Sequence, residues 1–173
     1  MNYLGIDPDL HHTAIAVVND DGKVMLLKTI RIADDLTGRY ALIELAQTLG
    51  DGIPPMLSPF VAAVEGQQLY KGCPASPQDI IHLACAAGIC LAKISQPKQL
   101  FLPTPQEWKK QVPKEIHQAR TLNNLGWGYK TLRDYSIPTR PPAEFQNIPE
   151  KEWKHLVDAI GLALWARDKE QAC

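Results

Sequence analysis

The stretch LGIDPDLHHTAIAVV, residues 4–18, holds two apolar runs separated by a short polar segment. Apolar runs on either side of a turn signal are typical of two antiparallel strands. One acid, Asp7, stands where the first strand ends. Asp before Pro8 favours a turn, because its side chain hydrogen-bonds the nearby backbone, whereas a carboxylate at a strand end is also suited to binding a metal ion. The choice between these roles depends on partners elsewhere in the chain.

The rest of the sequence extends these strands into an α/β pattern. Strands followed by alternating helices and strands predict a mixed sheet with helices packed on its faces. The helix that begins at Ser76 and Pro77 is apolar almost all round, so it is either central in the core or a contact between subunits. Residues 126–149 are rich in Gly, Pro and aromatic residues and predict a long irregular loop. The expected strands are 2–8, 13–19, 22–32, 60–66 and 99–104, and the expected helices are 37–49, 76–94, 105–112, 114–127 and 150–170.

Length and composition predict one domain spanning residues 1–173. The chain is 45% hydrophobic and 21% charged, which is ordinary for a soluble globular protein. No apolar run reaches the roughly 20 residues that a membrane span needs, and no secretory signal is visible. We therefore expect a cytoplasmic protein without a membrane partner. The four cysteines form no CxxC pair, so structural zinc and disulfides are not expected.

Charge is distributed unevenly along the chain. The net charge is −1, but residues 71–140 carry +6, while residues 1–70 carry −5 and residues 141–173 carry −2. Taken as a whole, this balance argues against binding nucleic acid. The uneven distribution is consistent with chance on a solvated surface, and equally with acids from both ends meeting beside phosphate-binding Lys and Arg.

Three carboxylates occupy positions where burial is costly. Asp7 and Glu65 each end an apolar strand, and Asp158 lies within the apolar helix LVDAIGLALWA. Buried carboxylates are usually paired, protonated or bound to metal. His155 and Asp158 are spaced i, i+3, which places them on one face of a helix. Such ligands suit Mg²⁺ or Mn²⁺, and two ions about 4 Å apart support phosphodiester hydrolysis.

The segments GIDPDLHHTAIAV, VAAVEGQQLYKG and HLVDAIGLALWA, in this order, resemble the three signature blocks of the RuvC family of Holliday junction resolvases. The resemblance covers nearly the whole chain and implies an RNase H-like fold with a five-stranded mixed sheet, a three-strand antiparallel meander plus parallel strands, flanked by helices. It implies a homodimer that uses two Mg²⁺ or Mn²⁺ ions per site to nick four-way DNA junctions symmetrically. Residues 76–94 occupy the dimer-forming position. The implied catalytic metal ligands are Asp7, Glu65, Asp158 and His155.

Two positions depart from the family pattern. Asp9 replaces a Gly that usually follows the first acid and Pro, so it is either another acid near the metals or an exposed variation. An aromatic that wedges into the junction usually follows the second acid at short spacing, where this chain has Gln68 and Leu69. Tyr70, one step later, is our candidate for the wedge, and surface packing is the equal alternative. His11 and His12 are expected to lie in an exposed turn.

Basic residues supply candidate DNA contacts. Lys110 matches a position where the family places catalytic or phosphate-contacting lysines, and we assign it to both groups. A run of charges is also typical of a solvated face, so this alternative stays open for each residue. The proposed DNA-binding residues are Tyr70, Lys71, Lys109, Lys110, Lys114, Arg120, Lys130 and Arg133.

The leading hypothesis is a crossover junction endodeoxyribonuclease. The alternatives are another RNase H-like nuclease, acting on flaps, other branched DNA or RNA precursors, and a junction-binding protein with weak catalysis. An actin-like nucleotide binder is disfavoured because the chain is too short for the second domain which that fold requires.

Overall fold

The structure, a computed structural model, describes residues 1–50, 60–67, 76–110, 112–127, 145 and 148–172. Its centre is a five-stranded sheet with the order β3-β2-β1-β4-β5. The first three strands form an antiparallel meander, and β4 and β5 are added in parallel beside β1. The strands are β1 (Asn2–Asp7), β2 (His12–Asn19), β3 (Val24–Arg31), β4 (Phe60–Val64) and β5 (Gln99–Phe101). The helices are α1 (Arg39–Gly50), α2 (Pro77–Lys93), α3 (Pro105–Lys109), α4 (Lys114–Asn124) and α5 (Glu150–Gln171).

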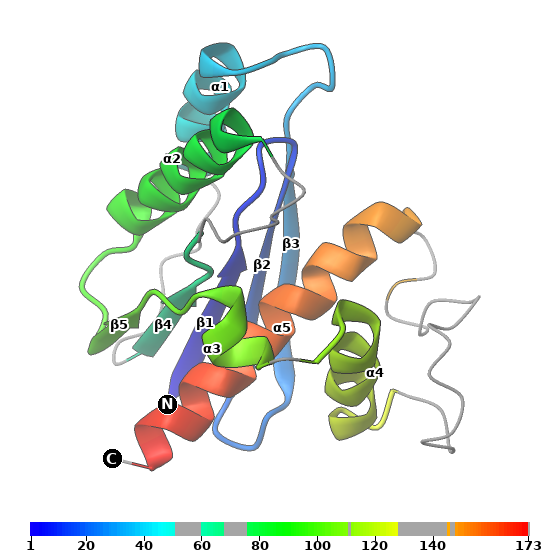
Figure 1. Cartoon of the computed structure of the whole chain (residues 1–173). Coiled ribbons are helices and arrows are strands. Elements are labelled where there is room, and N and C mark those ends of the chain that lie inside the picture. The colour runs from blue at the N-terminus through cyan, green and yellow to red at the C-terminus, as the bar shows by residue number, and fades with distance from the viewer. Residues whose placement is uncertain (51–59, 68–75, 111, 128–144, 146–147, 173) are drawn as a thin grey trace.

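The two faces of the sheet are covered by different helices (Figure 1). Helices α1 and α2 lie on one face, and α5 crosses the other face with α3 and α4 beside it. Side chains alternate between the faces along a strand. Accordingly, Tyr3 packs in the core cluster of α5, whereas Leu4 and Ile6 pack in the cluster of α1 and α2. The same alternation places Asp7 on the α5 face.

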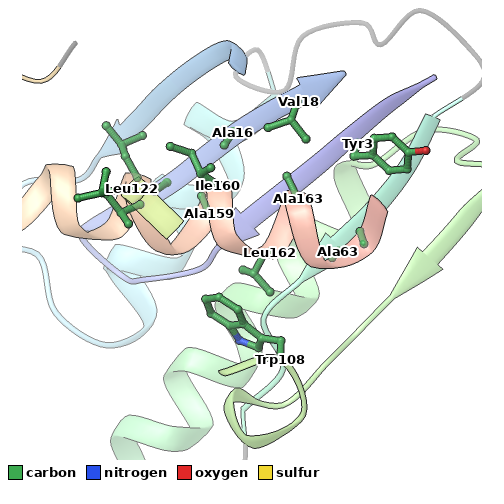
Figure 2. Close-up of a cluster of buried hydrophobic side chains, with 14 of the residues drawn as sticks. Tyr3, Ala16, Val18, Ala63, Trp108, Leu122, Ala159, Ile160, Leu162 and Ala163 are labelled. Atoms are coloured by element: carbon green, nitrogen blue, oxygen red, sulfur yellow. The ribbon is translucent and has the colours of Figure 1, made fainter. Parts of the chain in front are cut away.

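Helix α5 approaches the sheet closely at Gly5. A Cβ atom at this position would lie 2.0 Å from the Ala159 carbonyl oxygen and 2.6 Å from the Ala163 amide nitrogen. Figure 2 shows α5 crossing the strands, with Ala159 and Ala163 toward the sheet and Trp108 on the far side of the helix from Ala16. Small residues on both elements thus allow the helix to lie against β1 and to bring its side chains to the ends of the strands.

The α/β class, the five-stranded mixed sheet and the flanking helices are confirmed. The N-terminus of α2 is as predicted: Ser76 caps the helix, Pro77 is in its first turn, and Asp79 completes a capping box. The structure bears on the first of the two roles offered for this helix, a central position in the core. Ile81 is 53% exposed and only Ala86, Ala87 and Cys90 are buried, so α2 is not a central core helix of the single chain.

Helix α5 begins and ends within one residue of the predicted range. Most of the predicted loop 126–149 lies outside the described residues. Among the helices that are described, none is both long and apolar enough to cross a membrane.

Candidate active site

Asp7 and Glu65 lie side by side at the ends of β1 and β4. The two strands are parallel, with Ile6 opposite Val64, and the Glu65 amide donates to the Ile6 carbonyl at 3.0 Å. Asp7 and Glu65 therefore each lie one residue beyond the last residue pair between β1 and β4. Both carboxylates are on the face of the sheet that α5 covers. Asp7 is 5% exposed and Glu65 is 6% exposed.

Helix α5 brings His155 and Asp158 to the same place. His155 Nδ1 lies 2.6 Å from Asp7 Oδ2. Asp158, one turn further along the helix, is 1% exposed. The i, i+3 spacing on one helical face is the reason that both residues reach the strand ends. Three segments far apart in the sequence thus bring three buried carboxylates and a half-buried imidazole close together.

Helices α3 and α4 supply hydrogen-bond donors to these carboxylates. Glu65 Oε1 accepts from the Trp108 indole at 3.0 Å and from the Lys109 ammonium at 3.2 Å. Lys109 Nζ is also 3.5 Å from Asp158 Oδ2, so it bridges the two acids. Lys114 Nζ lies 2.9 Å from the same Asp158 oxygen, and the Gln118 amide donates to Asp158 Oδ1 at 3.0 Å.

The clustering of acids perturbs their titration. Burial, together with the neighbouring Asp7 charge, raises the pKa of Glu65 to about 8. Burial acts in the same direction on Asp7, but the hydrogen bond and positive charge of His155 outweigh it and hold the pKa of Asp7 below its usual value. The hydrogen bond to Asp7 raises the pKa of His155. Without a bound cation, the site therefore favours a proton on Glu65 and an ion pair between Asp7 and His155.

The chemistry of the donor set fits a hard divalent cation, because carboxylate oxygens predominate. The described residues nevertheless contain no group of three acidic, His or Cys side chains arranged to hold one ion. The positive charge between Glu65 and Asp158 is instead the ammonium of Lys109. Lysine thus balances part of the acidic charge at this site.

The basic residues predicted from sequence separate into three groups. Lys109 and Lys114 contact the carboxylates. Lys110, which we expected to be catalytic, is exposed at the end of α3, and with Arg120 it lines a pocket between α3, α4 and α5. The remaining four candidates, Tyr70, Lys71, Lys130 and Arg133, lie outside the described residues.

Asp9 forms the turn between β1 and β2. Its Oδ1 atom accepts from the backbone amides of His11 and His12 at 2.8 and 3.0 Å, and its carbonyl accepts from the Thr13 hydroxyl at 2.6 Å. The turn role first considered for Asp7 is therefore performed by Asp9, two residues later. His11 and His12 are half-buried rather than fully exposed, which corrects the expectation for this turn.

Two residues in contact with the carboxylates, Trp108 and Gln118, are absent from the predicted site. The sequence carries one usable signal for Gln118: it stands four residues after Lys114, so both side chains lie on the same face of a helix. Nothing in the sequence distinguishes the Trp108 indole from an ordinary core residue.

The sheet order, the helices on each face and the position of the acids at the strand ends agree with the RNase H-like fold expected from the sequence. No protein-family model matches the sequence, and no curated protein matches it either.

Solved structures with this fold are similar over nearly the whole chain. RuvC from Thermus thermophilus in complex with a Holliday junction substrate aligns with a TM-score of 0.62 at 18% identity, covering 99% of this chain and 96% of that one. A second structure of RuvC from the same organism gives a TM-score of 0.56 at 18% identity, with 99% and 97% covered. The yeast mitochondrial Holliday junction resolvase Ydc2 gives 0.55 at 17% identity, with 97% and 78% covered. The similarity to the RuvC family expected from the three sequence blocks is thus confirmed for the fold.

Proposed function

We propose that this chain is a metal-dependent endonuclease that resolves four-way DNA junctions by paired, symmetric nicks, with residues 1–173 acting as one nuclease domain. The observation that carries the proposal is the convergence of Asp7, Glu65, Asp158 and His155, from three distant segments, on one buried point at the edge of the sheet. The full-length similarity to RuvC and to a yeast Holliday junction resolvase supports the choice of substrate.

Asp7, Glu65, Asp158 and His155 would hold two Mg²⁺ or Mn²⁺ ions. When bound, the two ions activate a water and stabilise the leaving oxygen of the phosphodiester. Lys109 bridges Glu65 and Asp158, so its ammonium would have to release at least one of them if both carboxylates were to hold ions. Its ammonium then becomes free to face a DNA phosphate beside the site.

Lys114 and His155 are suited to different tasks. Lys114 is half-exposed and contacts Asp158 Oδ2, and the acidic surroundings outweigh its burial and raise its pKa. It therefore stays charged and can contact a phosphate at the mouth of the site. His155 faces Asp7 through Nδ1, and once its other ring nitrogen has lost its proton, that nitrogen would be available to the attacking water or to an ion.

The exposed face of α2 supports a homodimer. Ile81, Ala84, Cys85 and Gly88 follow the spacing of a single helical face, all four are exposed, and nothing lies within 4 Å of a Cβ atom placed at Gly88. Small residues let two helices approach closely. A symmetric pairing through this face would give one active site for each of two opposed DNA strands.

The decisive experiment compares the wild type with Asp7→Asn on a labelled four-way junction. We expect Asp7→Asn to abolish Mg²⁺-dependent cleavage, because it removes a carboxylate ligand, and to retain junction binding, because it leaves the basic residues in place. Cleavage of the junction at the wild-type rate by Asp7→Asn would contradict the proposed site.

A linear duplex, a flap and an RNA hairpin serve as companion substrates. Paired nicks confined to the junction are expected. Cleavage restricted to flap or RNA substrates would instead identify another RNase H-like nuclease, and binding of the junction without cleavage by the wild type would identify a junction-binding protein.

A further inference from the structure

A pocket of about 230 Å³ lies between α3, α4 and the second half of α5. Its wall includes Trp108, Lys110, His117, Arg120, Trp165 and Asp168. The volume is somewhat below the roughly 300–1,000 Å³ typical of sites for drug-sized ligands, so a ligand the size of a nucleotide would fill the pocket and extend from its open side.

The charged residues that line the pocket are mostly basic. Its one acid, Asp168, is already paired with Arg167 at 2.8 Å. Lys110 and Arg120 form no ion pair among the described residues. Lys110 also has a φ of 59°, a conformation that costs free energy in a residue other than glycine. Within the described residues, the pocket therefore offers an anionic ligand two cations that have no ion-pair partner.

Aromatic surface accompanies this charge. Trp165 lines the pocket and is held edge-on by Phe101, with ring centroids 5.4 Å apart. Nucleobases stack on aromatic side chains such as the indole ring, and this packing tolerates any base. Two cations beside an indole are the combination that binds a nucleotide, through its phosphate and its base together.

Trp108 connects the pocket to the carboxylates. Its indole nitrogen donates to Glu65 at 3.0 Å while its ring also lines the pocket, and Figure 2 shows this ring on the far side of α5 from Ala16. Lys109, next in sequence, likewise contacts Glu65 and lines the pocket. The pocket thus begins one side chain away from the proposed catalytic centre.

We propose that this pocket binds one nucleotide of a single DNA strand, with its phosphate between Lys110 and Arg120 and its base beside Trp165. The assignment to a DNA strand rests on the proposed nuclease function. The pocket would hold a nucleotide near the cut and so fix the strand relative to the carboxylates, a role for which neither Trp165 nor Lys110 needs to contact the reacting phosphate.

The direct test is calorimetric titration of the metal-free protein with thymidine monophosphate, thymidine and inorganic phosphate. We expect the nucleotide to bind about tenfold more tightly than either fragment, because both halves of the pocket contribute. Arg120→Gln should weaken nucleotide binding about fivefold and reduce the salt dependence of oligonucleotide binding by about one unit of slope. Lys28→Gln, which removes an exposed charge on β3, is the matched control and should change neither value.

Asn124→Trp, which places a large side chain in the pocket wall, should abolish nucleotide binding, and circular dichroism reports whether this variant folds. Equal affinity for phosphate and nucleotide, or unchanged affinity in both Arg120→Gln and Asn124→Trp, would overturn the proposal.

A single-stranded oligonucleotide should displace the mononucleotide from the pocket. If the oligonucleotide does not compete, the pocket binds free nucleotides only, and the assignment to a DNA strand is overturned. These titrations do not depend on cleavage. If the protein binds the nucleotide but cuts no substrate, the result would contradict the nuclease function and still support the nucleotide-binding pocket.

Discussion

Two residues of α4 divide the oxygens of the Asp158 carboxylate between them. Lys114 contacts Oδ2. The side-chain amide of Gln118 donates one hydrogen bond to Oδ1 and another to the Lys154 carbonyl, each with a length of 3.0 Å. Gln118 is 1% exposed, so its amide cannot exchange these bonds for water. We infer that Gln118 is a positioning residue, which fixes the orientation of Asp158 without contacting substrate.

Gln118→Met should therefore weaken binding of Mn²⁺ to the protein by about 10- to 100-fold, the usual effect of losing a group that orients a metal ligand. The loss of folding free energy should be small, about 1 kcal/mol, because Lys114 still contacts Asp158. Calorimetric Mn²⁺ titration and thermal unfolding measure the two effects separately. Glu115→Gln, at an exposed position on the same helix, is the control, and unchanged Mn²⁺ affinity in Gln118→Met would contradict a positioning role.

The protonation of Glu65 makes stability depend on pH. Its pKa is raised to about 8 in the folded protein by burial and by Asp7, from an ordinary value near 4.3. The folded state therefore holds a proton that the unfolded state releases within this window. The metal-free protein should lose stability as pH rises from about 4.5 to about 8.

Glu65→Gln removes this titration and still accepts the Trp108 hydrogen bond through its amide oxygen. We expect its unfolding free energy to fall less steeply with pH than that of the wild type across the same range. His155, whose raised pKa also costs stability as pH increases through it, is present in both proteins and cancels in the comparison. Denaturant unfolding in the presence of a chelator measures the two curves, and parallel curves would contradict a protonated Glu65.

At the scale of elements, the contact between α5 and β1 positions the whole site. The helix carries His155 and Asp158, the strand carries Asp7, and Gly5 sets the distance between them. A helix displaced outward by the width of a methyl group would carry both side chains away from the strand ends.

Gly5→Ala should destabilise the fold strongly, by about 3 kcal/mol, because the added methyl group would overlap the backbone of α5 rather than a flexible side chain. In a monomeric background such as Ala84→Arg, Gly88→Ala adds a methyl group that meets open space on α2, and should instead stabilise the helix by about 0.5–1 kcal/mol. Thermal denaturation of the two variants makes the comparison. Equal effects of the two substitutions on stability would show that the close approach of α5 to β1 does not require glycine at position 5.

At the scale of the whole molecule, paired nicking requires two sites in one assembly. The exposed face of α2 lies on the opposite side of the sheet from α5 (Figure 1), so changes there leave the carboxylates of the same chain in place. A variant on this face therefore tests the proposed dimer separately from the proposed catalytic site.

Ala84→Arg should yield a monomer, because a charged side chain would be buried at the close contact of two small-residue helices. On a plasmid cruciform, we expect single nicks in place of the linear product of paired cleavage. Ala172→Arg, an equally exposed position at the end of α5, is the control. Sedimentation analysis gives the oligomeric state, and a dimeric Ala84→Arg protein that still linearises the plasmid would place the interface elsewhere.

The sequence by itself determined the element order, the α/β class and the positions of the acids. Asp7, Glu65 and Asp158 could be found because each interrupts an apolar pattern whose period is read directly from the chain. The spacing of His155 and Asp158 likewise follows from the helical period.

Only the tertiary structure decided which donors meet these acids. Lys109, rather than its neighbour Lys110, bridges Glu65 and Asp158, since the choice depends on how the end of α3 is directed. Asp9, rather than Asp7, forms the turn, because the alternation of β1 points Asp7 at α5. Gln118 contacts Asp158 across 40 residues of sequence. Local patterns in the sequence show where a polar side chain interrupts a run of apolar residues. Contacts between distant segments depend instead on how the helices pack, and no local pattern encodes that packing.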